Sequence, residues 1–204
     1  MRAVPHSSDP LLRRMTLDEW ARLPEDEDGE IVDGWLVEEE APDFLHELIV
    51  GWLLQALVPW ARSRGGIAGG SGAKFAVASN RGRKPDVTVF LPGGKLPPAR
   101  GLVRVPPTIA VEIVSARARD RRRDRVDKAA EYAAFGIAWY WIVDPEPLRL
   151  EIHRLGDDRV YAAALTATAG IERDVPGCPG LVLDLDELRA DIARLPQTDD
   201  EEPR

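Results

Sequence analysis

Apolar and polar residues recur with different periods along the chain, and each period predicts a type of element. Between positions 43 and 62, apolar residues return every three to four positions, which predicts a long amphipathic helix. Asp33-Gly34 separates two short runs of β-forming residues, and this dipeptide is a strong signal for a hairpin. Further upstream, Thr16 followed by Glu19 predicts an N-cap and a capping box at the start of a short helix.

The rest of the pattern predicts strands alternating with helices. Strands are expected at 73–78, 86–91, 109–114 and 138–143, followed by a hairpin of 148–154 with 160–164. Residues 119–135 predict a helix and 184–195 a final turn or helix, whereas 79–84 predict a turn and 92–107 a loop. This order predicts a mixed α/β domain with a central β-sheet flanked by helices.

The ends of the chain differ in composition from its centre. Residues 16–195 predict a single domain, since 204 residues suffice for one domain with a substantial core. Residues 1–15 are polar and predict a flexible N-terminal arm. Residues 196–204 predict a disordered acidic tail.

Charge is distributed unevenly, which changes how the formal net charge of −8 is interpreted. Residues 16–47 hold thirteen acidic residues and one basic residue, whereas 115–128 hold seven basic and three acidic residues. The total excludes a histone-like coat for nucleic acid, but a local basic surface is still expected. A single cysteine, no long apolar run and no secretory signal predict a cytoplasmic protein without disulfides or a membrane span.

A carboxylate in the middle of an apolar strand is the first candidate for chemistry. Glu112 interrupts the strand at 109–114, and Asp86 opens the preceding strand. If these strands pair, the two carboxylates approach each other, and a hard divalent ion such as Mg²⁺ would relieve their repulsion. The alternative is structural: Asp86 caps a turn and Glu112 pairs with an arginine.

An ordered series of short motifs gives a more specific indication. The series runs Pro85-Asp86, Val111-Glu112-Ile113-Val114-Ser115, Asp124-Arg125-Val126-Asp127-Lys128, Tyr132, Gly136 and Tyr140-Trp141-Ile142-Val143-Asp144-Pro145. It resembles the Uma-type restriction endonuclease family, which belongs to the PD-(D/E)XK nuclease superfamily. The resemblance covers about residues 15–190. It implies a restriction-endonuclease-like fold.

The resemblance also implies roles for individual residues. Asp86 and Glu112 match the metal-binding acids, with Mg²⁺ as the expected ion and Mn²⁺ as a substitute. The superfamily lysine two residues after the second acid is replaced here by Val114. Lys128 matches a lysine that members of the family carry on the following helix, so it is expected to complete the catalytic set. Periodicity alone allows Lys128 to be a surface residue paired with Asp124 equally well.

Each of two accessory residues, Glu30 and His46, allows two interpretations. Glu30 matches a position where the family commonly has an acid, but it could equally be an exposed residue at a strand end. His46 falls within the apolar stripe of the helix at 43–62, where a histidine is more often packed in the core. The family match makes His46 a possible neighbour of the active site, not a metal ligand.

A run of arginines follows directly after the Glu112 strand. It consists of Arg117, Arg119, Arg121, Arg122, Arg123 and Arg125. Clustered guanidinium groups suit phosphate backbones, so this run is the expected DNA-binding surface, although charge runs are usually just solvated.

The function expected from these features is a Mg²⁺-dependent endodeoxyribonuclease, a hydrolase of DNA phosphodiester bonds. By analogy with small nucleases that cut both strands, we expect a homodimer. The alternative is a catalytically silent nuclease-fold scaffold for binding or assembly, favoured by the missing strand lysine and the acidic total.

Overall fold

The computed structural model describes residues 13–24, 29–37, 42–114 and 123–196. A six-stranded main sheet has the order β11-β10-β9-β8-β7-β4, and its β8–β9 pair is parallel while the other pairs are antiparallel. Its strands are β4 (Ile67–Gly69), β7 (Val87–Phe90), β8 (Ile109–Ile113), β9 (Trp139–Pro145), β10 (Leu148–Leu155) and β11 (Tyr161–Ala167). β7 pairs with β8, which confirms the strand pairing that the predicted approach of Asp86 and Glu112 requires.

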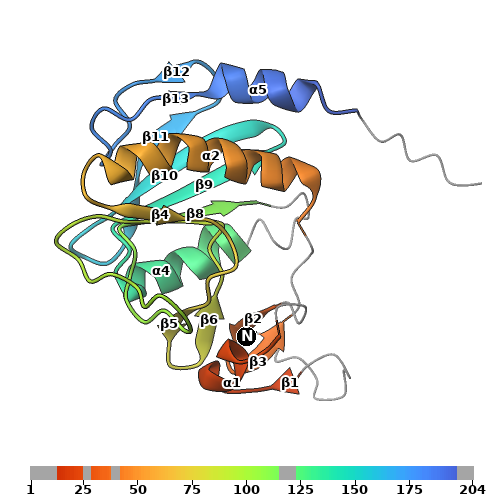
Figure 1. Cartoon of the computed structure of the whole chain (residues 1–204), viewed down its shortest axis with the longest axis vertical. Helices are drawn as coiled ribbons and strands as arrows, with labels where there is room; N and C mark the ends of the chain where they lie inside the picture. Colours follow the sequence, from red (N-terminus) through yellow and green to blue (C-terminus); the bar gives the residue numbers. More distant parts are fainter. Residues whose placement is uncertain (1–12, 25–28, 38–41, 115–122, 197–204) are drawn as a thin grey trace, which may run out of the picture.

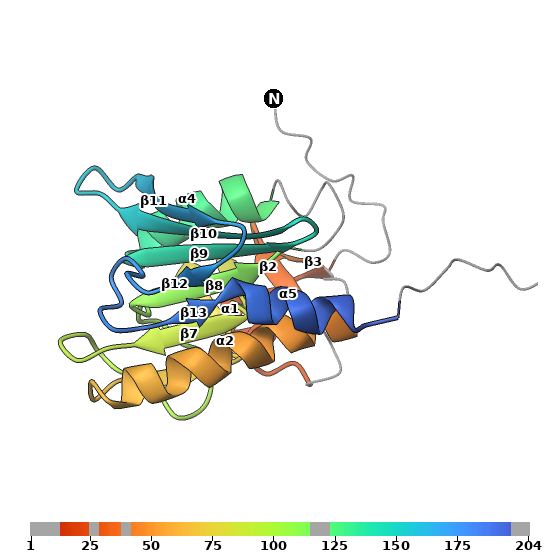
Figure 2. The same ribbon diagram turned by 90° about the horizontal axis from the view of Figure 1, so that it is seen from above.

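One face of the main sheet is covered by α2 (Phe44–Arg62), with α5 (Leu185–Ala193) beside it (Figure 1, Figure 2). Asp43 caps α2 by accepting a hydrogen bond from the His46 amide. The apolar stripe of α2, with Ile49, Leu53 and Leu57 fully buried, packs on the sheet. Within the described part of the chain, α2 alone is long and apolar enough to cross a membrane, a test that core helices also pass.

The opposite face carries the crossover from β8 to β9. Its described part is a π-helical turn, η1 (Arg123–Lys128), continued by α4 (Ala129–Phe135). Gly136 ends α4 in the left-handed region at φ 97°, where its amide closes the last turn. Tyr132 and Tyr140 pack edge to face in the core under α4.

A second, five-stranded sheet lies below α4 in Figure 1, in the order β1-β3-β2-β6-β5. It comprises β1 (Arg13–Arg14), β2 (Glu30–Val32), β3 (Trp35–Val37), β5 (Phe75–Ala78) and β6 (Arg81–Arg83), with α1 (Leu17–Ala21) against it. Trp20 of α1 fills the space above Gly82, where any side chain would overlap the indole ring. A small third sheet pairs β12 (Ile171–Glu172) with β13 (Leu183–Asp184).

Most local predictions are confirmed. Thr16 forms the capping box with Glu19, and Asp33-Gly34 turns the β2–β3 hairpin with both residues at positive φ. The long helix begins one residue later than predicted, at Phe44, and ends at Arg62 as predicted.

Two local predictions were wrong or incomplete. Residues 79–84 are not simply a turn, because Arg81–Arg83 forms β6, which pairs with β5 and β2. This pairing places β5 in a second sheet, which the sequence did not predict, in addition to the predicted central sheet. The segment from 67 to 69, predicted only to end α2, forms the edge strand β4. The predicted arm and tail, and the start of the helix at 119–135, fall mostly outside the described residues.

Candidate active site

Asp86 lies at the start of β7 and is held by the two elements on either side of it. Its amide donates to the Val111 carbonyl at 3.1 Å, and its Oδ2 accepts a 2.6 Å hydrogen bond from the Ile113 amide. Its Oδ1 lies 3.1 Å from Nε2 of His46 on α2. Asp86 is therefore fixed by the neighbouring strand and by the first turn of α2.

His46 is mostly buried, and its contact with Asp86 determines its electrostatics. Burial disfavours the charged imidazolium, but the hydrogen bond and negative charge of Asp86, together with Glu47, outweigh it and raise the pKa of His46. The structure thus brings His46 to the predicted acid rather than leaving it as an inert part of the apolar stripe.

Glu112 is buried in the middle of β8 and has a partner on each carboxylate oxygen. The Lys128 ammonium donates to Oε2 at 2.7 Å, and the Tyr132 hydroxyl donates to Oε1. Lys128 at the end of η1 and Tyr132 in α4 are four residues apart, so both side chains point to the same place on the sheet. Burial, followed by the charges of Glu112 and Glu30, raises the pKa of Tyr132, which keeps its hydroxyl protonated as a donor.

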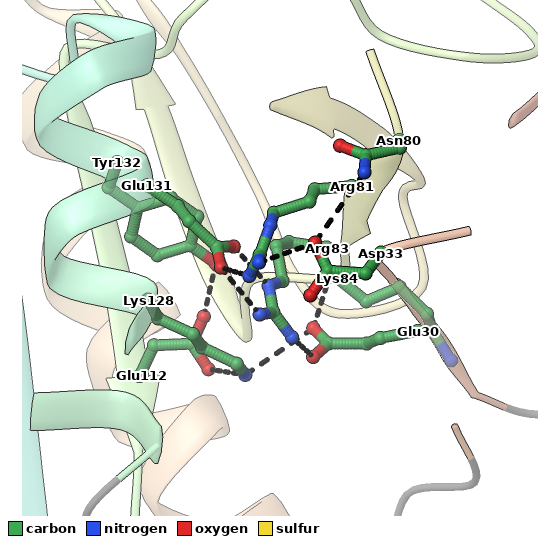
Figure 3. A network of polar contacts seen from close by, with 10 residues as sticks. All are labelled: Glu30, Asp33, Asn80, Arg81, Arg83, Lys84, Glu112, Lys128, Glu131 and Tyr132. Carbon is green, nitrogen blue, oxygen red and sulfur yellow. Dashed lines mark hydrogen bonds and ion pairs between the residues drawn. The ribbon is translucent and has the colours of Figure 1, made fainter. Parts of the chain in front are cut away.

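Glu30 reaches the same place from the second sheet and is completely buried. Its Oε1 lies 3.4 Å from the Lys128 ammonium and accepts a 2.9 Å hydrogen bond from the Lys84 amide. Its Oε2 accepts a 2.6 Å hydrogen bond from Arg83. The Lys128 ammonium therefore lies between two carboxylates, Glu112 of the main sheet and Glu30 of the second sheet (Figure 3).

The polar network continues away from Glu30 along β6 (Figure 3). Arg83 also donates to both oxygens of Glu131 in α4, at 2.7 and 3.0 Å. Arg81 donates to Glu131 and, at 2.7 Å, to Asp33. Burial opposes the charge of Arg83, but Glu30 and Glu131 raise its pKa far above the ordinary value. The network joins the second sheet to α4 through alternating charges.

These contacts decide between several of the alternatives left open by the sequence. Glu112 pairs with a lysine and a tyrosine, not with an arginine. Lys128 is 3% exposed, so its interpretation as a surface residue is wrong. Glu30 is buried, so its interpretation as an exposed strand end is also wrong. The roles of these residues in catalysis or metal binding remain predictions.

Sequence reasoning gave no role in the site to Arg81, Arg83, Glu131 or Tyr132, which belong to the network. A signal was present in Arg81-Gly82-Arg83, where two like side chains alternate with a glycine, as they do on one face of a strand. Among the described residues, no group of three or more His, Cys, Asp and Glu is arranged to hold a metal ion.

The predicted DNA-binding arginines are only partly described. Arg117, Arg119, Arg121 and Arg122 lie outside the described residues, as does the side chain of Arg123. Arg125 is described, and its guanidinium contacts Glu151 and Asp144.

A family model, Uma2, described as "Putative restriction endonuclease", matches residues 16–186. The chain belongs to the Uma2 family. This membership confirms the resemblance that the ordered motifs indicated and supports a nuclease acting on nucleic acid.

One solved structure is similar over most of the Uma2 chain. It is a crystal structure from Anabaena variabilis ATCC 29413, titled as a putative nuclease belonging to DUF820, with 19% sequence identity and a TM-score of 0.65. The match covers 86% of this chain and 98% of the other, and it confirms the predicted α/β fold class. No protein with a curated description matches.

Proposed function

We propose that this Uma2 protein is a Mg²⁺-dependent endonuclease that hydrolyses DNA phosphodiester bonds. The observation that carries the proposal is the buried Lys128 ammonium at Glu112, on the strand that pairs with the one opened by Asp86. A lysine beside a strand carboxylate supplies the positive charge that phosphodiester cleavage needs. Family membership supports the same reaction class.

The chemistry of the donor set fits a magnesium ion. Asp86 and Glu112 provide hard oxygen donors, and the Ile113 carbonyl is a third candidate on the same strand. An ionised carboxylate has about four lone-pair sites, so Glu112 can accept hydrogen bonds from Lys128 and Tyr132 and also bind a cation. A bound Mg²⁺ would lower the pKa of a coordinated water and offset charge on the scissile phosphate.

The chain's own residues would prepare the site for that ion. His46 and the Ile113 amide hold Asp86 in one orientation. Tyr132 and Glu30 hold Glu112 and Lys128 in place from opposite sides. Lys128 would then offset the negative charge that develops on the phosphate, or orient the attacking water.

Plasmid nicking in Mg²⁺ or Mn²⁺ tests the proposal. We expect the wild type and the exposed-acid control Glu187→Gln to nick DNA, while Asp86→Asn and Glu112→Gln lose the activity. The control removes one carboxylate from α5, which lies on the face of the main sheet opposite α4 (Figure 1). Activity that survives in both Asp86→Asn and Glu112→Gln would remove the assignment.

A catalytically silent scaffold is the second candidate, and one observation favours it. Lys128 and Tyr132 each donate to one oxygen of Glu112, so the chain itself offsets the charge of this carboxylate. Titration calorimetry with Mg²⁺ and Mn²⁺ separates the two functions. Binding that is lost in Asp86→Asn supports the nuclease, and no binding at millimolar metal supports the scaffold.

Cleavage of both strands by a domain of this size would use two copies, so we propose a homodimer. Light scattering of the purified protein tests it directly, since the dimer has twice the mass of the 22.6 kDa chain.

A further inference from the structure

Arg125 lies in η1, three residues before Lys128, and its side chain is held on the main sheet. Its Nη1 lies 2.7 Å from each of the two Glu151 oxygens. Its Nη2 donates to Asp144 at 3.2 Å. Two carboxylates thus surround one guanidinium that is 25% exposed.

Glu151, one of the two acids that hold Arg125, lies in the same row across the sheet as Glu112, which holds Lys128. Glu112 of β8 pairs with Ile142 of β9, and Ile142 pairs with Glu151 of β10. Glu112 and Glu151 are therefore two strand spacings apart, about 10 Å. η1 lies across this row with Lys128 on one acid and Arg125 on the other.

The conformation of η1 makes such contacts important. A π-helix is rare and occurs mostly as a single turn, frequently at functional sites. Contacts between its side chains and the sheet help to hold such a turn in place. Arg125 and Lys128 provide these contacts at two points along η1.

We infer that Arg125 is a positioning residue, whose ion pairs with Glu151 and Asp144 fix η1 across the sheet so that the Lys128 ammonium reaches Glu112. The catalytic part of this inference rests on the proposed nuclease function. It assigns Arg125 a role different from the phosphate contact that the arginine run predicts. Two carboxylates already offset its charge, and they would repel a phosphate placed beside them.

The electrostatics of the pair agree with this assignment. Burial opposes the charge of Arg125, but Glu151 and Asp144 raise its pKa. Burial raises the pKa of Glu151, but Arg125, Arg149 and His153 outweigh that effect and lower it. Both partners therefore stay charged near neutral pH.

Hydrogen exchange tests the positioning without any need for activity. Arg125→Gln and Glu151→Gln remove the contact from either side, and Arg149→Gln is the matched control. Arg149 also pairs with Glu151, at 2.8 Å, but it comes from β10 and not from η1. We expect amides in 123–128 to exchange about tenfold faster in the first two variants and unchanged in the control. Unchanged exchange in both variants would overturn the inference.

Nuclease kinetics then separate positioning from DNA binding. In Arg125→Gln and Glu151→Gln we expect kcat to fall about tenfold, since small displacements of a catalytic group are costly, with KM unchanged. A raised KM in Arg125→Gln, with a salt slope reduced by about 0.9 and kcat unchanged, would identify a phosphate contact and overturn the inference. If the wild type has no nuclease activity, the proposed function fails, and hydrogen exchange alone decides whether Arg125 positions η1.

Discussion

The two faces of the main sheet are covered in chemically opposite ways. On the α2 face, the core consists of apolar side chains such as Ile49, Leu53 and Trp141. On the α4 face, apolar residues share the interior with charged side chains, and Glu112 and Lys128 are each 3% exposed. The same β8 contributes to both faces through alternate residues.

The difference separates residues that stabilise the fold from residues for which we propose a role in chemistry. Apolar burial on the α2 face contributes to stability at about 25 cal/mol per Å². Buried ion pairs contribute little net stability, because removing charges from water costs about as much as their attraction returns. A chain selected only for stability would therefore not need Glu30, Glu112, Lys128 and Arg83 in its interior. Their concentration at one place points to function.

Removing the central cation should have the largest effect, and it should be on activity. Lys128→Met removes the ammonium while retaining an unbranched side chain of similar length. We expect nicking to fall by about 10²- to 10³-fold, the usual cost of losing one group that stabilises a transition state. The comparison is with Lys95→Met, which replaces an exposed lysine in the 92–107 loop and should be unaffected. Full activity in Lys128→Met would show that the α4 face is structural only.

Removing Arg83 tests whether the buried charges depend on one another. Arg83→Met removes the guanidinium that Glu30 and Glu131 share. We expect the free energy of unfolding to be about 3–5 kcal/mol lower than in the wild type. The matched control is Arg104→Met, whose partner Asp18 is exposed, and it should change stability by no more than about 1 kcal/mol. Urea denaturation measures both.

A second substitution sharpens the same test. Adding Glu30→Gln to Arg83→Met removes one of the two carboxylates whose charge Arg83 offsets, so the double variant should regain part of the lost stability. A double variant as unstable as the sum of the two single variants would contradict the proposed dependence.

The α2 face should respond differently to truncation. Leu53→Ala leaves a cavity between α2 and the sheet, and we expect a loss of about 2–5 kcal/mol in urea denaturation. Nicking by the folded fraction should change little, since Leu53 lies about two turns along α2 from His46, the α2 residue that contacts Asp86. A large drop in kcat for Leu53→Ala, measured where the protein is folded, would mean that the packing of α2 controls the position of His46 and Asp86.

The sequence predicted the α2 face better than the α4 face for a physical reason. Helix periodicity and the Thr16 cap are local signals, and the structure confirms the helices that they predict. Glu112 was also recognisable, because a carboxylate within an apolar strand is unusual by itself. The pairing of Glu112 with Lys128 could not be recognised in the same way, because the helical pattern placed Lys128 well off the core stripe. Only the family resemblance identified Lys128.

The remaining part of the site depends on contacts distant in sequence. Arg81-Gly82-Arg83 has the composition of a turn, yet it is a strand because β5 and β2 pair with it. Gly82 is required because Trp20, more than sixty residues earlier, fills the space above it. The alternation in Arg81-Gly82-Arg83 is compatible with a strand, but no local pattern identifies its partner strands, so the contacts of Arg83 and Glu131 could not be assigned before the second sheet was known.

The smallest expected effect concerns the outer pair on the α4 face, between Arg125 and Glu151. Because Arg125 lowers the folded-state pKa of Glu151 below 4.5, the pair stabilises the protein above that pH, and the stabilisation is lost as pH falls through the folded-state pKa. Glu151→Gln should therefore be less stable than the wild type at pH 7, by no more than about 1 kcal/mol for a partly exposed pair. The difference should shrink as the pH falls below 4.5, which urea denaturation at several pH values can measure. A difference that grows on acidification would mean that Glu151 is protonated more readily in the folded state than in the unfolded chain. That result would mean that Arg125 does not stabilise the charged form of Glu151. The contrast between this partly exposed pair and the buried pair of Glu112 and Lys128 would then be lost.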